Sequence, residues 1–152
     1  LILNNKSNFN RNSDLLLYMA ARSENVEIIK KFYNKKIILI DRFTDSTIAY
    51  QHYGMGVNLN LIETLNKYLL KNIKVGFTFL NIVNQKNLQK RLKQRKSLNR
   101  YDKFKMSFYN NVQKGFIHLS QQQKNKYQLI NSNLEIDKNE KLIISKIDRL
   151  IK

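Results

Sequence analysis

A short apolar run that ends in charged residues constrains the fold of this chain more than any other feature. Residues 37–40 read Ile-Ile-Leu-Ile, and Asp41 and Arg42 follow directly. A run of this kind, without polar alternation, is typical of a strand buried on both faces of a parallel sheet. In open α/β sheets the ligand crevice lies outside the carboxyl ends of the strands. The sequence therefore predicts an α/β fold with Asp41 and Arg42 at a binding site.

Length and composition set the outer limits. The 152 residues are a single-domain length. Cysteine is absent, which excludes disulfides and thiolate metal sites and is compatible with a reducing cytoplasm. The chain has no apolar run of about 18 residues and no signal peptide at its start. We therefore expect a cytoplasmic protein that makes no use of a membrane.

The net charge of +17 has two interpretations. Its field attracts anions, which points to a basic nucleic-acid-binding module. The other interpretation is a codon bias toward A and T, because proline is absent and asparagine, lysine and isoleucine are heavily used. The lysines are scattered, and the clearest basic concentration lies in residues 86–105. We favour the codon bias and keep nucleic-acid binding as an alternative function.

The residues after the apolar run carry a longer pattern. It reads Asp-Arg-Phe-x-x-Ser-x-x-Ala-Tyr-Gln over residues 41–51 and resembles the signature of bacterial thymidylate kinases. Residues 16–22 are similar to the Leu-Leu-Phe-x-Ala-x-Arg helix of that family, and residues 78–80 and 99–102 fall at its fourth strand and its lid motif. The resemblance implies a P-loop kinase-type parallel sheet flanked by helices. It also implies transfer of the ATP γ-phosphate to dTMP with Mg²⁺, a step of dTTP synthesis.

The resemblance assigns roles to residues near the start of the chain. Tyr18 would stack on the thymine ring, and Arg22 would hydrogen-bond the base. Arg42 would bind the acceptor phosphate, because a guanidinium fork pairs bidentately with phosphate oxygens. Asp41 would serve the magnesium shell through water, since hard cations prefer oxygen ligands.

The resemblance also completes the dTMP set and places a lid. Thr47 would read the pyrimidine edge, Tyr50 would pack on the deoxyribose, and Gln51 belongs to the same set. Residues 86–105 would close over the phosphates, where arginines can neutralise charge on the transferred phosphoryl group. The candidate lid arginines are Arg91, Arg95 and Arg100. Each could equally belong to a solvated basic helix, and Arg100 is the strongest candidate of the three.

The remaining elements follow from periodicity and local signals. The apolar stripe of residues 15, 19, 26 and 29 predicts a helix from an N-cap at Ser13 to about Tyr33, with Arg22 on the same stripe. The aromatic stripe from Phe104 to Phe116 predicts a long helix packed in the core. We further expect a helix starting near residue 45 or 46, a loop at 52–56, a helix at 60–71, strands at 74–83 and 127–130, and a closing helix. His52 and His118 stand apart from other ligand types, so no metal site is expected from them.

The family's donor-phosphate motif, Gly-x-x-x-x-Gly-Lys-Ser/Thr, is not written in this sequence, whose four glycines stand at positions 54, 56, 76 and 115. The resemblance places that motif and the central first strand upstream of Leu1, in a segment of about fifty residues. We interpret residues 1–152 as the C-terminal three quarters of a single thymidylate kinase domain, a homodimer when complete. Loss of the first strand would leave 37–40 and 74–82 facing a gap, so the chain should be poorly stable and inactive, unless those strands pair directly. A kinase for another nucleoside monophosphate stays open.

Overall fold

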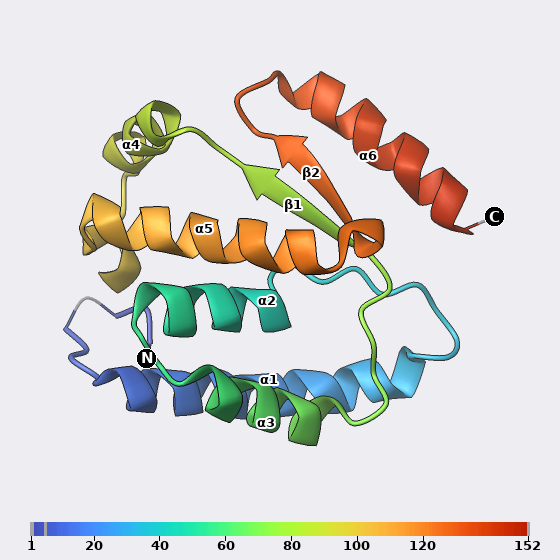
Figure 1. Cartoon of the computed structure of the whole chain (residues 1–152), viewed down its shortest axis with the longest axis horizontal. Helices are drawn as coiled ribbons and strands as arrows, with labels where there is room; N and C mark the ends of the chain where they lie inside the picture. The colour runs from blue at the N-terminus through green and yellow to red at the C-terminus, as the bar shows by residue number, and fades with distance from the viewer. Residues whose placement is uncertain (1, 5, 152) are drawn as a thin grey trace. The chain divides into compact units, whose positions relative to one another are not determined.

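The computed structural model describes residues 2–4 and 6–151, which fall into two compact units (Figure 1). The first unit comprises the chain up to Val75 and residues 98–119, and the second comprises 76–97 and the chain from Ser120 onward. The first unit contains α1 (Arg11–Phe32), α2 (Thr44–Thr47), η1 (Ile48–Gly54), α3 (Leu59–Leu70), η2 (Arg100–Lys103) and most of α5 (Met106–Gln122). The second contains β1 (Thr78–Ile82), α4 (Gln85–Gln94), η3 (Lys124–Lys126), β2 (Tyr127–Asn131) and α6 (Ile136–Ile151).

Helix α1 begins earlier than the sequence predicted. Its N-cap is Asn10, whose side-chain Oδ1 accepts hydrogen bonds from the backbone N–H groups of Asn12 at 2.9 Å and Ser13 at 3.0 Å. The prediction of Ser13 as N-cap is therefore wrong. Asparagine caps a helix as well as serine does, and capping at Asn10 brings Ser13 and Asp14 inside the first turn. The predicted stripe is confirmed, because Leu15, Met19, Val26 and Ile29 are all buried.

Two apolar clusters form the core of the first unit. One joins α1 to α3, which lies alongside it in Figure 1, through Leu15, Met19, Val57 and Ile62. The other joins η1, η2 and α5 through Ala49, Tyr101, Phe108 and Val112. Phe104 and Phe116 pack against this second cluster, so the aromatic stripe is confirmed as core packing, although Phe104 precedes α5, which begins at Met106.

The segment predicted as a loop at 52–56 begins inside a helix. Residues 48–54 form the π-helix η1, and the turn comes only after Gly54. A Cβ atom on Gly54 would lie 2.5 Å from Phe108 Cε2, and one on Gly115 would lie 2.5 Å from the Tyr53 ring. The two glycines therefore let η1 and α5 approach closely. The wide π turn puts Ala49 and Gln51 in the interior, and the loop prediction missed this because glycine was taken as a turn signal.

The predicted buried strand at 37–40 is not formed. The segment is extended without strand pairing, and Ile37 and Leu39 are 65% and 82% exposed. A strand of a parallel sheet is buried only when neighbours cover its edges and faces. The sheet that the described residues form has two strands, β1 and β2. The edges and faces of residues 37–40 are therefore not covered in this way, and the prediction is wrong.

The second unit contains the parallel pair of strands. β1 and β2 run side by side in Figure 1, in register from Thr78 opposite Tyr127 to Ile82 opposite Asn131. The strand predicted at 74–83 is shorter, and the strand predicted at 127–130 is confirmed. Each strand buries one residue, Leu80 or Ile130. These elements confirm the α/β class with an incomplete parallel sheet. Within residues 2–4 and 6–151, no helix is both long and apolar enough to cross a membrane.

Candidate functional site

Arg22 is the buried cation on the core-facing stripe of α1. Its side chain is only 9% exposed. Nη2 donates to Thr47 Oγ1 at 2.6 Å and to the Phe43 carbonyl oxygen at 3.0 Å, and Cζ lies 4.8 Å from the centre of the Phe43 ring. Burial lowers the pKa of Arg22 from its ordinary value, but an arginine stays protonated in proteins. The site therefore holds a fixed positive charge.

One donor of Arg22 is unused. Its Nε is buried and has no hydrogen-bond partner within the described part of the chain. A buried donor left unpaired costs about 1–3 kcal/mol. A ligand acceptor that displaced the atoms covering Nε would satisfy this donor, and Thr47, itself only 3% exposed, holds the guanidinium in place.

Asp41 and Arg42 follow the extended segment, and both are exposed. Arg42 has φ of +61°, in the left-handed region that residues with a Cβ atom seldom adopt. Its guanidinium carbon lies 5.3 Å from the centre of the Tyr50 ring. Backbone strain of this kind is found disproportionately at binding sites. Residues 2–4 and 6–151 contain no cluster of three acidic, histidine or cysteine side chains that could hold a metal ion.

Three tyrosines line the same region of the first unit. The Tyr101 ring centre lies 6.3 Å from that of Tyr18 and 5.8 Å from that of Tyr50, both edge to face. Gln51, which is 1% exposed, donates from Nε2 to the Tyr101 hydroxyl at 3.4 Å. Burial raises the pKa of Tyr18 and, more strongly, that of Tyr101. Both hydroxyls therefore stay protonated at neutral pH.

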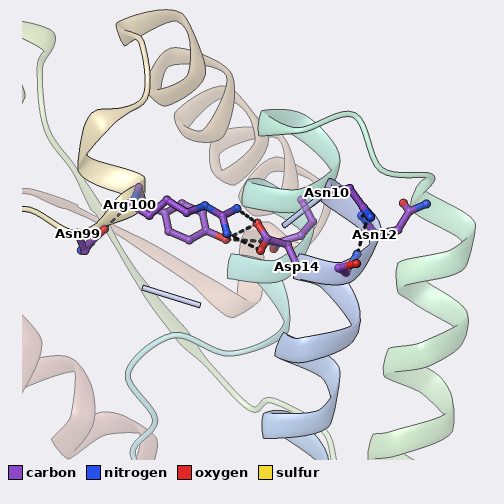
Figure 2. Close-up of polar contacts among 8 residues, drawn as sticks. Asn10, Asn12, Asp14, Asn99 and Arg100 are labelled. Atoms are coloured by element: carbon purple, nitrogen blue, oxygen red, sulfur yellow. Dashed lines mark hydrogen bonds and ion pairs between the residues drawn. The ribbon is translucent and has the colours of Figure 1, made fainter. Parts of the chain in front are cut away.

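A buried carboxylate, Asp14, pairs with Arg100, as Figure 2 shows. Asp14 is 0% exposed, accepts from Arg100 Nη1 at 2.9 Å, and forms a second contact with Arg100 Nη2. The Tyr101 hydroxyl donates to the same carboxylate at 3.3 Å. Sequence reasoning missed Asp14 and Tyr101. The capping box of Asn99 and Asp102 was the available signal for Tyr101, because it marks the start of η2.

The first unit thus holds seven of the predicted site residues in two groups. Arg22 and Thr47 contact each other, and a second group gathers around Tyr101 and Asp14, namely Tyr18, Arg42, Tyr50, Gln51 and Arg100. Arg91 and Arg95 lie in the second unit. Arg91 Nη2 donates to the carbonyl oxygen of Ser132 at 2.6 Å, and Arg95 is exposed. The predicted lid, 86–105, covers α4 in one unit and η2 in the other.

Comparisons with known proteins point to one family. The model of the thymidylate kinase family matches residues 1–143. The thymidylate kinase of Wolbachia pipientis from Culex pipiens is 32% identical over 136 residues, which cover 88% of this chain and 64% of that protein. The one from the Wolbachia of Brugia malayi is 40% identical over 106 residues, which cover 68% of this chain and 50% of that protein. The chain thus spans less than two thirds of these relatives.

A solved structure is similar as well. The crystal structure of thymidylate kinase from Ehrlichia chaffeensis superposes with a TM-score of 0.70 at 30% sequence identity, and the match covers 97% of this chain and 69% of that one. The family model, the curated relatives and the solved structure point to the same group of proteins. The chain belongs to the thymidylate kinase family.

Proposed function

We propose that the first unit forms the dTMP site of a thymidylate kinase and that the complete domain transfers the γ-phosphate of ATP to dTMP. The observation that carries the proposal is the buried Arg22, whose Nε has no partner among the described residues while Nη2 is held by Thr47. An acceptor on a pyrimidine edge would satisfy that donor and remove a cost of about 1–3 kcal/mol. A base is therefore the ligand that best fits this position.

The neighbouring side chains suit the rest of a nucleotide. Tyr18 is one turn of α1 before Arg22, so its ring can stack on a base that Arg22 holds by its edge. Tyr50 and Gln51 follow Thr47 in η1, on the deoxyribose side of the proposed site. Arg42, strained and exposed beside Tyr50, would take the 5′-phosphate bidentately.

The transfer itself requires little covalent help from the protein. An oxygen of the dTMP phosphate attacks the γ-phosphorus of ATP, the bond to the β–γ bridging oxygen breaks, and dTDP and ADP result. Magnesium, when bound with ATP, neutralises phosphate charge. Asp41 would hold a water of its shell, and Arg42 would orient the attacking phosphate. By the family resemblance, Arg91 and Arg95 would neutralise charge on the transferred group, whereas Arg100 is paired with Asp14.

The proposal extends to the setting of the complete protein. Residues 1–152 would form one domain with the segment that carries the donor-phosphate motif, with 86–105 as its lid. That domain would work as a homodimer in the cytoplasm, with which the absence of cysteine is compatible.

The test is ligand binding by this chain, measured by calorimetry with dTMP, dUMP and dCMP. We expect dTMP to bind tightest, with an advantage over dUMP of about 1–3 kcal/mol because one methyl group separates them. Tyr18→Ala should weaken dTMP binding by about 1–3 kcal/mol, the contribution of base stacking on an aromatic ring. Tyr68→Ala is the matched control, because Tyr68 on α3 is 73% exposed.

Arg22→Ala completes the test. It should abolish the preference for dTMP over dCMP, because the base edge loses its fixed donor. Unchanged dTMP affinity in both Tyr18→Ala and Arg22→Ala would refute the base site. Equal affinity of the three nucleotides, together with salt-dependent, sequence-independent binding of DNA, would instead favour the nucleic-acid-binding alternative.

A further inference from the structure

The Asp14 carboxylate pairs with both terminal nitrogens of the Arg100 guanidinium. Asp14 is 0% exposed and the Arg100 side chain 14% exposed, and both terminal nitrogens of the guanidinium contact the carboxylate. A buried carboxylate is tolerated only when it is paired and hydrogen-bonded. The rings of Tyr101 and Phe9 also lie 5.5 and 5.9 Å from the guanidinium carbon. Asp14 thus neutralises the charge of Arg100 within the protein, whereas an arginine that serves a phosphoryl group keeps its charge for that ligand.

The pair joins two elements that carry the proposed dTMP site. Asp14, Tyr18 and Arg22 are spaced four residues apart, so they follow one face of α1. On the other side, the capping box of Asn99 and Asp102 fixes the backbone of η2, where Arg100 and Tyr101 are consecutive. The ion pair therefore fastens η2 to the first turn of the helix that carries Tyr18 and Arg22.

Tyr101 is the residue whose position depends on this connection. Its hydroxyl donates to Asp14 and accepts from Gln51, and its ring meets Tyr18 and Tyr50 edge to face. It is 6% exposed. A shift of η2 would therefore be transmitted through Tyr101 to both tyrosines of the proposed site.

We propose that Arg100 is a positioning residue of the dTMP site, which acts through Asp14 and Tyr101 to hold the aromatic wall beside the base and makes no contact with phosphate. This inference rests on the proposed function. It predicts that loss of the pair affects ligands with and without a phosphate group alike. A phosphate-binding arginine would instead affect only the phosphorylated ligand.

The experiment compares dTMP with thymidine as calorimetric ligands of the whole chain. The variants are Asp14→Asn, Arg100→Gln and the double variant, with Glu27→Gln and Arg149→Gln as matched controls. Glu27 forms an exposed ion pair with Lys30 on the same helix, and Arg149 is exposed on α6. We expect each single variant to weaken dTMP and thymidine by the same factor, on the order of tenfold, and the double variant to be no worse than either single one.

Two milder variants separate positioning from general stability. Arg100→Lys keeps the charge and loses the fork, so it should recover part of the affinity. Tyr101→Phe keeps the ring and loses the hydroxyl, and it should weaken both ligands by less than the single charge variants do. Circular dichroism at the binding temperature verifies that each variant is folded, and a variant that is not folded is replaced by the milder one of its pair.

The outcomes are distinct. A loss confined to dTMP in Arg100→Gln, with Asp14→Asn binding as well as or better than the unmodified chain, would mean that Arg100 contacts phosphate and would overturn the inference. Unaltered affinity of all folded variants would overturn it as well and leave the proposed function standing. An unmodified chain that binds neither dTMP nor thymidine would overturn the proposed function and this inference with it.

Discussion

Replacing Thr47 with valine removes one hydrogen bond, between Thr47 and Arg22, from the centre of the site. Thr47 is 3% exposed, and its hydroxyl accepts the 2.6 Å hydrogen bond from Arg22 Nη2. Hydrogen bonds to charged groups contribute about 1.5–3 kcal/mol. The methyl group that valine adds in place of the hydroxyl returns at most about 0.8 kcal/mol by burial. We therefore expect the free energy of unfolding to fall by about 1–2 kcal/mol.

Urea denaturation followed by circular dichroism measures this change. With a slope of about 2 kcal/mol per M, the midpoint should fall by about 0.5–1 M. Thr64→Val on α3 is the matched control, because Thr64 is exposed and should shift the midpoint little. An unchanged or higher midpoint for Thr47→Val, or an equal shift in Thr64→Val, would refute the reasoning that the hydroxyl supports the buried guanidinium.

Four further substitutions test the packing and the tyrosine cluster. Gly115→Ala should lower the free energy of unfolding by about 1–2 kcal/mol, because its Cβ would lie 2.9 Å from the Cβ of Tyr53. This loss should exceed the gain from the better helix propensity of alanine. A melting temperature at or above that of the unmodified chain would contradict this. Leu39→Lys should change stability by less than about 0.5 kcal/mol, since Leu39 is 82% exposed, whereas Leu15→Ala should cost about 2–5 kcal/mol, both read from urea midpoints. Burial raises the pKa of Tyr101 above the ordinary value of about 10, so the unfolded chain loses this proton first and stability falls as pH rises above about 10. Tyr101→Phe should make that fall shallower in urea titrations between about pH 9 and 11, and an identical slope would contradict the assignment.

Sequence patterns predicted the helices of the first unit because their signals are local. The residues that bury α1 recur every three or four positions, so the pattern itself encodes the face, and Leu15, Met19 and Val26 are buried as expected. The N-cap was misplaced by three residues because Asn10 and Ser13 are equally good caps, and only the path of the preceding chain decides between them.

The segment at 37–40 shows what such patterns leave out. An apolar run specifies that the residues can be buried, but a strand also needs backbone partners on its edges. The pair of strands that formed, β1 and β2, lies about fifty residues apart in sequence, and its pairing depends on partners that no local pattern names. Leu39 has the same residue type and a similar apolar neighbourhood to Leu80, yet one is 82% and the other 7% exposed.

The lid arginines show the same limit for the prediction of chemical roles. Arg91, Arg95 and Arg100 stand in one basic stretch, and sequence alone offers all three to a phosphate. The structure places the Arg91 fork on the carbonyl of Ser132 and the Arg100 fork on a carboxylate 86 residues earlier. Because a guanidinium pairs equally well with carboxylate and phosphate, the residue type cannot say which partner it meets. What separates Arg100 is the burial of Asp14, since leaving a buried carboxylate without its cation costs about 3–5 kcal/mol.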